Sequence, residues 1–189
     1  KKGHRKIAYL GGDPDLNYAW QRRSGYLSAA KTHGCDVLDG YLHDGITDEM
    51  AARRAVAELL KNPDRPTAIL CVTDAVAIGA IHALAHAGIT VGEEISVIGF
   101  DGLPMGEAIH PGLTTMSQAS YQVGRAVGRI VVAQANETKE ANAPASEFSQ
   151  ILWEATLTIR GSANPPAPKL AVNANPAPKP VTNAKGGIS

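Results

Sequence analysis

Short apolar runs alternate with longer segments of helical spacing along most of this chain. The apolar runs predict strands at Lys6–Leu10, Cys35–Leu42, Thr67–Val72 and Glu94–Phe100. The segments between them predict helices over residues 18–34, 47–62 and 74–88, with glycines closing the first and third. Continuous apolar strands that alternate with helices are typical of a parallel sheet covered on both faces. The pattern therefore predicts an α/β fold with helices on both faces of a parallel sheet.

The composition changes abruptly near the C-terminus. The heptapeptide ANPPAPK, which starts at Ala163, recurs as ANPAPK within a run of Ala, Pro, Asn and Lys. Such a segment has almost nothing to bury and favours extended conformations. We expect residues 163–189 to form a disordered tail and residues 1–162 to form the folded part.

The predicted strands place several polar side chains at one edge of the sheet. Ligands of open parallel sheets collect beyond the carboxyl ends of the strands. The residues expected at this rim are Asp13, His43, Asp74 and Asp101, joined by Trp20, Arg22 and Arg23 from the first helix. Carboxylates accept hydrogen bonds from hydroxyls, guanidinium groups donate them, and aromatic faces cover the C–H face of a sugar. This set predicts reversible binding of a polyhydroxylated small molecule.

Each of these residues also has a simpler structural interpretation. Asp74 could be only the N-cap of a helix, and Asp101 before Gly102 could be only a turn residue. One of the two adjacent arginines is expected on the solvated helix surface, because neighbouring helical residues point about 100° apart. The pair His82 and His86 has helical spacing but no third ligand, so we predict no metal site.

Charge and cysteine content narrow the class of protein. Lys and Arg together number 18, and so do Asp and Glu together. The chain therefore has no excess of positive charge to neutralise nucleic-acid phosphates, and we do not expect it to bind nucleic acid by itself. Cys35 and Cys71 form no CxxC pair, which favours a reduced cytoplasmic protein. No apolar run is long enough for a membrane span, and no signal peptide opens the chain. We expect no catalytic residues and no cofactor.

Four blocks of sequence resemble a known family. The blocks are GHRKIAYLGG from Gly3, RRSGYLSA from Arg22, PTAILCVTDAVAIGAIHALAHAGITVGEEISVIGFDG from Pro66 and PGLTTMSQ from Pro111. In this order they resemble the lac-repressor/gal-repressor family from about Gly3 to Ser162. The resemblance implies a two-lobed core, like that of periplasmic sugar-binding proteins, which closes on an effector, and a helix-turn-helix that reads operator DNA.

The resemblance also implies roles for single residues. Arg22 matches an arginine that contacts effector hydroxyls, and Asp74 matches an aspartate that accepts from them. Trp20 lies in the same contacting segment, and the loop at His43 carries a contact in many members. Thr73 stands where the family usually has asparagine.

The matched region begins past the middle of the family's chain, so the helix-turn-helix is expected to be missing here. The resemblance places residues of about 5–110 and 148–161 in the C-terminal lobe and the segment 111–140 in the absent N-terminal lobe. The helix within Leu113–Ala135 then has apolar residues with no sheet to cover them: Val123, Val127, Ile130 and Val131.

The family dimerises through its core. The predicted helix over residues 74–88 displays apolar residues around much of its circumference, and we expect a homodimer contact at Val76, Ile78, Ile81 and Leu84. The alternative is that all four belong to the internal core.

Taken together, the sequence predicts the effector-sensing core of a sugar-responsive, DNA-binding transcriptional regulator in the cytoplasm. The alternative is a periplasmic or transport-linked sugar-binding protein of the same fold. A third hypothesis is an enzyme that uses the Gly11-Gly12 turn for a nucleotide or phosphosugar, but no catalytic group accompanies this turn.

Overall fold

A computed structural model describes residues 3–137 and 151–166. Its centre is a six-stranded sheet in the order β2-β1-β3-β4-β5-β6. The strands are β1 Ile7–Leu10, β2 Leu42–His43, β3 Ala68–Cys71, β4 Ser96–Asp101, β5 Thr114–Ser117 and β6 Thr156–Thr158. All neighbouring pairs are parallel except β5 and β6, which are antiparallel. The predicted α/β fold with a parallel sheet is confirmed.

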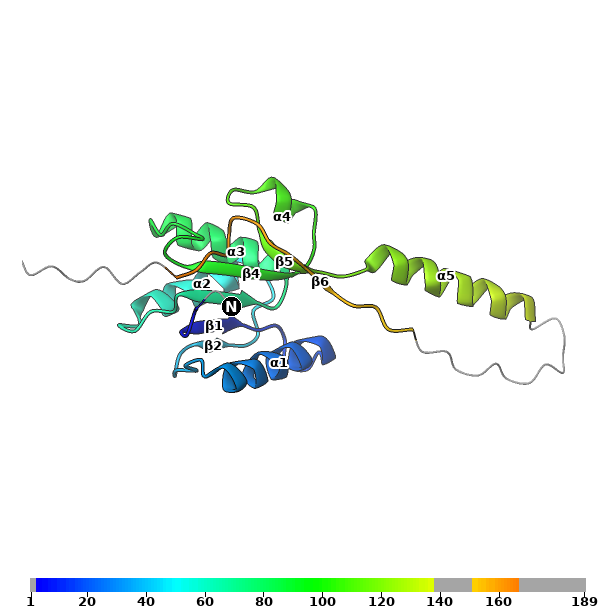
Figure 1. The fold of residues 1–189 in the computed structure, drawn as a ribbon, viewed down its shortest axis with the longest axis horizontal. Coiled ribbons are helices and arrows are strands. Elements are labelled where there is room, and N and C mark those ends of the chain that lie inside the picture. Colours follow the sequence, from blue (N-terminus) through cyan, green and yellow to red (C-terminus); the bar gives the residue numbers. More distant parts are fainter. Residues whose placement is uncertain (1–2, 138–150, 167–189) are drawn as a thin grey trace, which may run out of the picture.

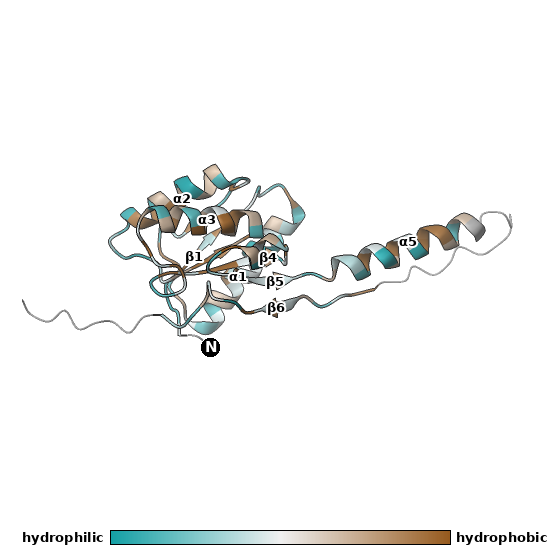
Figure 2. Cartoon of the chain, turned by 90° about the horizontal axis from the view of Figure 1, so that it is seen from above, coloured by the Kyte–Doolittle hydropathy of each residue, from teal (hydrophilic) through white to brown (hydrophobic). Residues whose placement is uncertain are grey.

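Helices lie on both sides of this sheet. They are α1 Asn17–His33, α2 Glu49–Lys61, α3 Asp74–His86, the short α4 Met105–Ala108, and α5 Ser120–Glu137. The helices α2 and α3 cover one side of the sheet and α1 the other (Figure 2). In contrast, α5 extends away from the sheet (Figure 1).

Local sequence signals fix most of these boundaries. Gly34 closes α1 in the left-handed conformation with φ 61°, as the glycine predicted. The helix α2 begins at Glu49, two residues later than predicted, because the carboxylate of Asp48 caps it by accepting from the amide of Ala51 at 2.7 Å. The predicted strand Cys35–Leu42 is mostly wrong. It is interrupted by a turn at Gly40, whose φ is 82°, and strand pairing resumes only at β2.

The two faces of the sheet are buried to different degrees. Tyr26 of α1 stacks on Tyr9 of β1, with ring centroids 5.1 Å apart, and its hydroxyl donates to the carbonyl of Ile7. On this α1 side, the strands beyond β1 carry side chains that are only half-buried, namely Leu70, Ile98, Phe100 and Met116. On the opposite side the side chains are buried: Ala8, Leu10, Ile69, Cys71 and Val97. The core therefore lies mainly between the sheet and the helices α2 and α3.

The predicted dimer contacts on α3 belong to this core. Val76, Ile81 and Leu84 are at most 3% exposed, and Ile78 packs partly buried against them. The helix packs on the sheet and also closely on α2: a Cβ atom on Gly79 would lie 2.9 Å from the Cα atom of Glu49. Burial on two sides explains the wide apolar circumference and places Val76, Ile81 and Leu84 in the internal core, whereas Ile78 stays partly exposed and its place in a dimer contact remains a prediction.

Two predicted boundaries also change. The strand β5 pairs with β4, so the segment proposed for the absent lobe, 111–140, begins inside this sheet and leaves it only after Ser117. Ala163 is buried and the carbonyl of Asn164 accepts from the hydroxyl of Ser96 at 2.9 Å, so the predicted tail starts later than Ala163. The rest of that tail, residues 167–189, lies outside the described residues.

The predicted apolar face of α5 has no partner among the described elements. Val123, Val127, Ile130 and Val131 are each more than 40% exposed. Among the residues that the structure describes, no helix is both long and apolar enough to span a membrane.

Asp74 is not the cap of α3. The cap is Thr73, whose hydroxyl accepts from the amide of Val76 at 3.3 Å. Asp74 is the first helical residue and is fully buried. Its carboxylate accepts from the amide of Leu103 at 2.7 Å and from the hydroxyl of Thr115 at 2.6 Å. The prediction of a capping role is therefore wrong, and the carboxylate instead joins α3 to β5 and to the loop after β4.

Replacement of Asp74 by alanine is expected to destabilise the fold. The substitution leaves the donors of Leu103 and Thr115 buried without an acceptor, which costs roughly 3 kcal/mol of unfolding free energy. The matched control is Asp48→Ala, which removes an exposed helix cap and costs about 1 kcal/mol. Urea denaturation of both variants measures the difference, and an equal loss in the two would contradict the structural role of Asp74.

Candidate functional site

The carboxyl ends of the strands hold an immobilised arginine. The guanidinium of Arg22, from α1, lies 3.7 Å from the ring centroid of Phe100 and 5.0 Å from that of Tyr18. Its Nη1 donates to the carbonyl of Val72 at 2.5 Å, and its Nη2 lies 3.6 Å from Oδ1 of Asp101. Stacking and hydrogen bonding fix the plane of the guanidinium. Arg22 is therefore positioned before any ligand arrives.

Asp101 is the acceptor beside this arginine. Its side chain remains about a quarter exposed (26%), and its backbone has a φ of 138°, which L-residues rarely adopt. The Nε2 of Gln118 donates to Oδ1 of Asp101 at 2.9 Å. The pKa of Asp101 is raised overall. Burial is the largest cause, and it outweighs the lowering by the Arg22 guanidinium and by the Gln118 hydrogen bond. The result is a strained, partly desolvated carboxylate next to a fixed cation, an arrangement typical of binding sites.

A cavity of about 490 Å³ opens beside this pair. It is lined by Phe100, Gln118, Ala119, Ser120, Val123, Gly124, Trp153 and Ala155. The volume falls within the range of small-molecule sites. Two aromatic side chains and one amide line the cavity, and the Arg22–Asp101 pair adjoins it through Phe100 and Gln118. This arrangement suits a ligand with an apolar face and a hydroxylated edge.

A smaller cavity of about 250 Å³ lies on the other side of α1's first turns. Trp20, Arg23 and Asp44 line it, and the Nε of Arg23 lies 3.0 Å from Oδ2 of Asp44. Arg23 is thus ion-paired rather than merely solvated. Burial, followed by the charge of Asp44, raises the pKa of Tyr9 to about 12, and the Tyr9 hydroxyl finds no hydrogen-bond partner among the described residues.

The structure brings together only part of the predicted rim. Arg22 and Asp101 meet, while Asp74 lies buried beneath them. Asp13 accepts from the amide of Asp15 within its own turn. The ring of His43 bonds the carbonyl of Gly40 within its own loop.

Sequence reasoning missed four residues that build the site: Tyr18, Phe100, Gln118 and Trp153. Two of them carried a signal in the sequence. Tyr18 precedes Arg22 by one helical turn, and Phe100 directly precedes Asp101 at a strand end. Gln118 and Trp153 are brought to the rim only by the pairing of β5 with β4 and β6.

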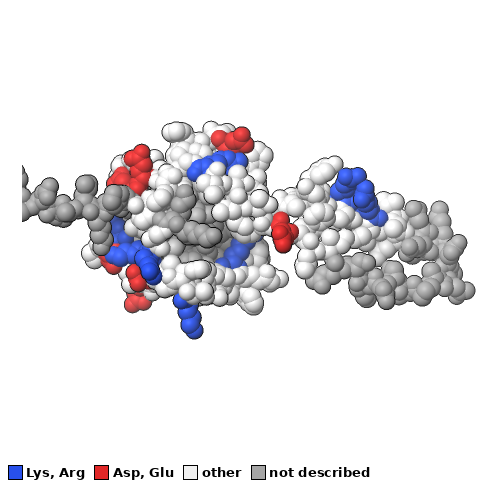
Figure 3. Space-filling model, viewed as in Figure 1, with Lys and Arg blue, Asp and Glu red and all other residues white. Residues whose placement is uncertain are grey.

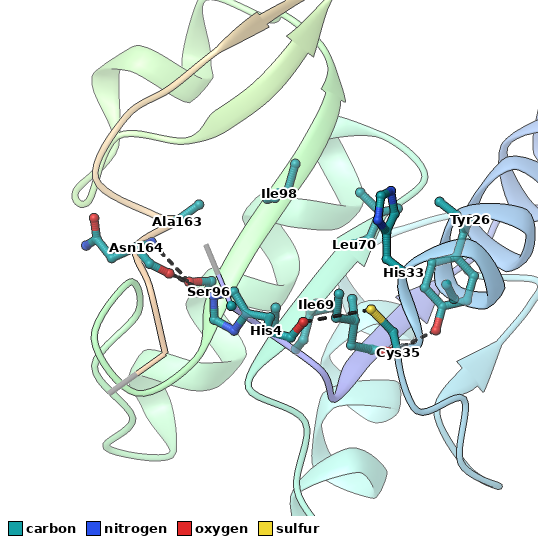
Figure 4. Close-up of a pocket in the computed structure, with 15 residues that line it drawn as sticks. His4, Tyr26, His33, Cys35, Ile69, Leu70, Ser96, Ile98, Ala163 and Asn164 are labelled. Atoms are coloured by element: carbon teal, nitrogen blue, oxygen red, sulfur yellow. Dashed lines mark hydrogen bonds between the residues drawn. The ribbon is translucent and has the colours of Figure 1, made fainter. Parts of the chain in front are cut away.

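A third hollow, of about 350 Å³, lies at the opposite, amino end of the strands (Figure 4). Its walls are mostly apolar and include Ile7, Ile69, Leu70 and Ile98, with His4, His33 and Cys35 at its edges. No Lys, Arg, Asp or Glu is among its lining residues. Such a hollow is poorly suited to a polyhydroxylated ligand, which favours the carboxyl-end rim.

Residues 3–137 and 151–166 contain no group of three or more His, Cys, Asp or Glu that could hold a metal ion. On the face shown in Figure 3, acidic and basic side chains are interspersed over the sheet and the helices packed on it, whereas α5 shows basic side chains only.

Comparison with known proteins identifies the family. Residues 1–163 match the family described as "Periplasmic binding protein-like domain". The HTH-type transcriptional repressor CytR of Escherichia coli (strain K12) is 33% identical over 125 residues, which are 66% of this chain and 37% of CytR. The HTH-type transcriptional regulator AglR of Rhizobium meliloti (strain 1021) is 32% identical over 180 residues, which are 94% of this chain and 49% of AglR. The chain thus spans less than half the length of these curated relatives.

Solved structures give the same assignment. A regulatory protein of the LacI family from Chloroflexus aggregans is 33% identical with a TM-score of 0.75, over 86% of this chain and 57% of that chain. A sugar-binding transcriptional regulator of the LacI family from Escherichia coli, complexed with phosphate, is 25% identical with a TM-score of 0.72, over 87% of this chain and 57% of that chain. The predicted resemblance is therefore confirmed: this chain belongs to the periplasmic-binding-protein-like family and covers part of the effector-binding core found in LacI-family transcriptional regulators.

Proposed function

We propose that the chain is the effector-sensing core of a sugar-responsive, DNA-binding transcriptional regulator. The observation that carries this proposal is the Arg22–Asp101 pair, which is held in place on Phe100 and adjoins a cavity of about 490 Å³. The relatives support a regulator over the alternative of a periplasmic or transport-linked binding protein, because they are transcriptional regulators. For the same reason we propose no enzymatic role.

The pair supplies complementary chemistry for a polyol. A hydroxyl donates to the Asp101 carboxylate, and an adjacent hydroxyl or ring oxygen accepts from a free N–H of Arg22. The ring of Trp153 is available to the C–H side of a sugar ring, whereas one face of Phe100 is already covered by Arg22. Since Asp74 is fully buried, its role in this proposal is to support the turn that directly follows Asp101.

The other predicted rim residues have a more peripheral place in this proposal. Trp20 lines the neighbouring cavity and is available to a larger effector that extends beyond Arg22. Asp13 and His43 are held in their own loops and require a side-chain rotation to contact a ligand.

We further propose that α5 and residues 151–155, the segment preceding β6, belong to a second lobe that closes over the rim. The apolar face of α5 is uncovered, and exposed Leu152 and Trp153 lie on the chain that returns to the sheet. A second lobe that packs on these residues places a lid over the effector. If the effector binds one arrangement of the lobes better than the other, it shifts the balance between them and thereby changes operator affinity. Operator DNA is then contacted by a helix-turn-helix outside this sequence, in the cytoplasm.

Sugar binding by this chain is expected to depend on Arg22 and Asp101. Titration of ¹⁵N-labelled protein with D-glucose, D-galactose, D-ribose and maltose should shift the amide signals of Phe100, Asp101 and Gln118. Arg22→Ala and Asp101→Ala should each weaken binding by about tenfold or more, because a hydrogen bond to a charged group contributes roughly 1.5–3 kcal/mol.

The matched control for this titration is Arg53→Ala, which removes an exposed arginine from α2, on the other side of the sheet. It should bind like the unmodified chain. Equal affinity of Arg22→Ala and Arg53→Ala, or no response to any of the four sugars, would contradict the proposed site.

We also propose a homodimer, with its contact at a different place from the one predicted. Leu103, in the turn after β4, and Met105, the first residue of α4, are exposed apolar side chains, and the amide of Leu103 bonds to Asp74 at the start of α3. Charged substitutions at the centre of an apolar contact disfavour association.

The Met105→Glu variant should therefore sediment as a single chain at micromolar concentration, whereas the unmodified protein sediments as a dimer. Met50→Glu, on the exposed face of α2, is the control and should remain dimeric. A single-chain mass for the unmodified protein would refute the homodimer.

A further inference from the structure

We propose that the cavity of about 250 Å³ beside Trp20 is a second binding site, which takes a small neutral polyol independently of the effector rim. This inference goes beyond the proposed function, because it gives this cavity a ligand of its own. Arg22 lies against the rings of Tyr18 and Phe100, at the rim. Trp20 and Arg23 leave α1 in other directions and line the second cavity. The first turns of α1 therefore separate the two places.

The hydroxyl of Tyr9 is the group that points to a ligand here. Tyr9 is 1% exposed, and its hydroxyl has no hydrogen-bond partner among the described residues. Tyr26, which stacks on it, differs in this respect, since its hydroxyl donates to the carbonyl of Ile7 at 2.7 Å. A buried hydroxyl without a partner loses its hydrogen bonds to water on folding and gains none in return. A bound molecule that supplies the partner would recover this cost.

The hydroxyl end of the Tyr9 ring meets the wall of the cavity at Asp44. A Cβ atom on Gly11 would overlap Oδ1 of Asp44 and would lie 2.7 Å from Cε1 of Tyr9. The carboxylate and the ring edge therefore converge over the same glycine. The main chain fixes the loop of Asp44 in this place: the amide of Gly11 donates to the carbonyl of His43 at 2.7 Å, and the amide of Ile46 donates to the carbonyl of Gly11 at 2.8 Å.

The ion pair of Arg23 and Asp44 presents donors and an acceptor to the same space. The Nε of Arg23 bonds Oδ2 of Asp44 at 3.0 Å, and neither Nη of Arg23 nor Oδ1 of Asp44 bonds any described residue. Both side chains are about a third exposed, at 38% and 34%. A ligand hydroxyl between Oδ1 and Tyr9 donates to the carboxylate and accepts from the tyrosine, while a second ligand oxygen accepts from Nη of Arg23.

The charge and size of the cavity define the class of ligand. Arg23 and Asp44 are the charged residues of its lining, and their charges cancel, which favours a neutral ligand over an anion or a cation. The volume lies just below the range of drug-sized sites, which leaves room for one small ring. The exposed ring of Trp20 and the side chain of Pro14 offer apolar contact to the C–H face of such a ring. These features fit a neutral polyol of pentose size.

The two tryptophans of the chain allow the two places to be read separately. Trp20 lines this cavity, Trp153 lines the cavity at the rim, and the sequence has no third tryptophan. In a Trp153→Phe chain, D-ribose or D-xylose should change the fluorescence of Trp20 saturably, whereas sodium acetate and inorganic phosphate should not. Arg23→Ala should weaken this response about tenfold, because it removes hydrogen bonds from a charged donor. Arg22→Ala should leave it unchanged.

Tyr9→Phe tests the unpartnered hydroxyl directly. Because this hydroxyl has no partner in the free chain, its removal should not lower the urea midpoint, yet it should weaken sugar binding at Trp20 about fivefold. The matched control is Tyr26→Phe, which removes the bonded hydroxyl of the same stacked pair. The control should lower the urea midpoint and leave the sugar affinity unchanged.

Three results would overturn the second site. They are no saturable response of Trp20 to either sugar, a response to acetate or phosphate in its place, and unchanged sugar affinity in Tyr9→Phe. A Trp20 response that Arg22→Ala abolishes would overturn its independence and make the cavity part of the effector site. The proposed function is read from Trp153 in a Trp20→Phe chain, so failure at either place leaves the result at the other intact.

Discussion

The buried carboxylate of Asp74 is the interaction on which the site depends. It accepts from the hydroxyl of Thr115 on β5 and from the amide of Leu103, and thereby fixes the turn that follows β4. Gly99 allows this approach, since a Cβ atom there would lie 2.2 Å from Oδ1 of Asp74. The helix start, two neighbouring strands and the turn are thus joined at one buried point. The turn that it fixes directly follows Asp101, the last residue of β4, whose backbone has a conformation that an isolated peptide would seldom adopt.

The cation of the site, Arg22, comes from the opposite side of the sheet. The helix α1 packs on β1 through Tyr26 and Tyr9, which places Arg22 over the last residues of β3 and β4. The guanidinium is held by the ring of Phe100 and the carbonyl of Val72 before it contacts any ligand. A donor and an acceptor from the two faces of one sheet therefore meet at its carboxyl edge, where open parallel sheets bind their ligands. Preorganisation of this kind reduces the entropy lost on binding.

Much of the fold was readable from the sequence, because apolar periodicity and helix-capping residues are local signals. The segments around β1, β3, β4, α1, α2 and α3 were predicted close to their observed positions. The strand Cys35–Leu42 failed because a turn at Gly40 outweighed its apolar composition. The role of Asp74 could not be read from its neighbours: its partners, Leu103 and Thr115, lie 29 and 41 residues away in the sequence. The same holds for Gln118, which only sheet pairing brings to Asp101, and for α3, whose second buried face is created by α2.

The central claim is that a sugar binds at the carboxyl edge of the sheet on Arg22 and Asp101. The most direct measurement is a crystal structure of the chain with the sugar that binds best in the titration. The account predicts sugar hydroxyls about 3 Å from the Asp101 carboxylate and the Arg22 guanidinium, with the ring against Phe100 or Trp153. A sugar bound instead in the apolar hollow near His4 and Cys35, with the rim unoccupied, would contradict it.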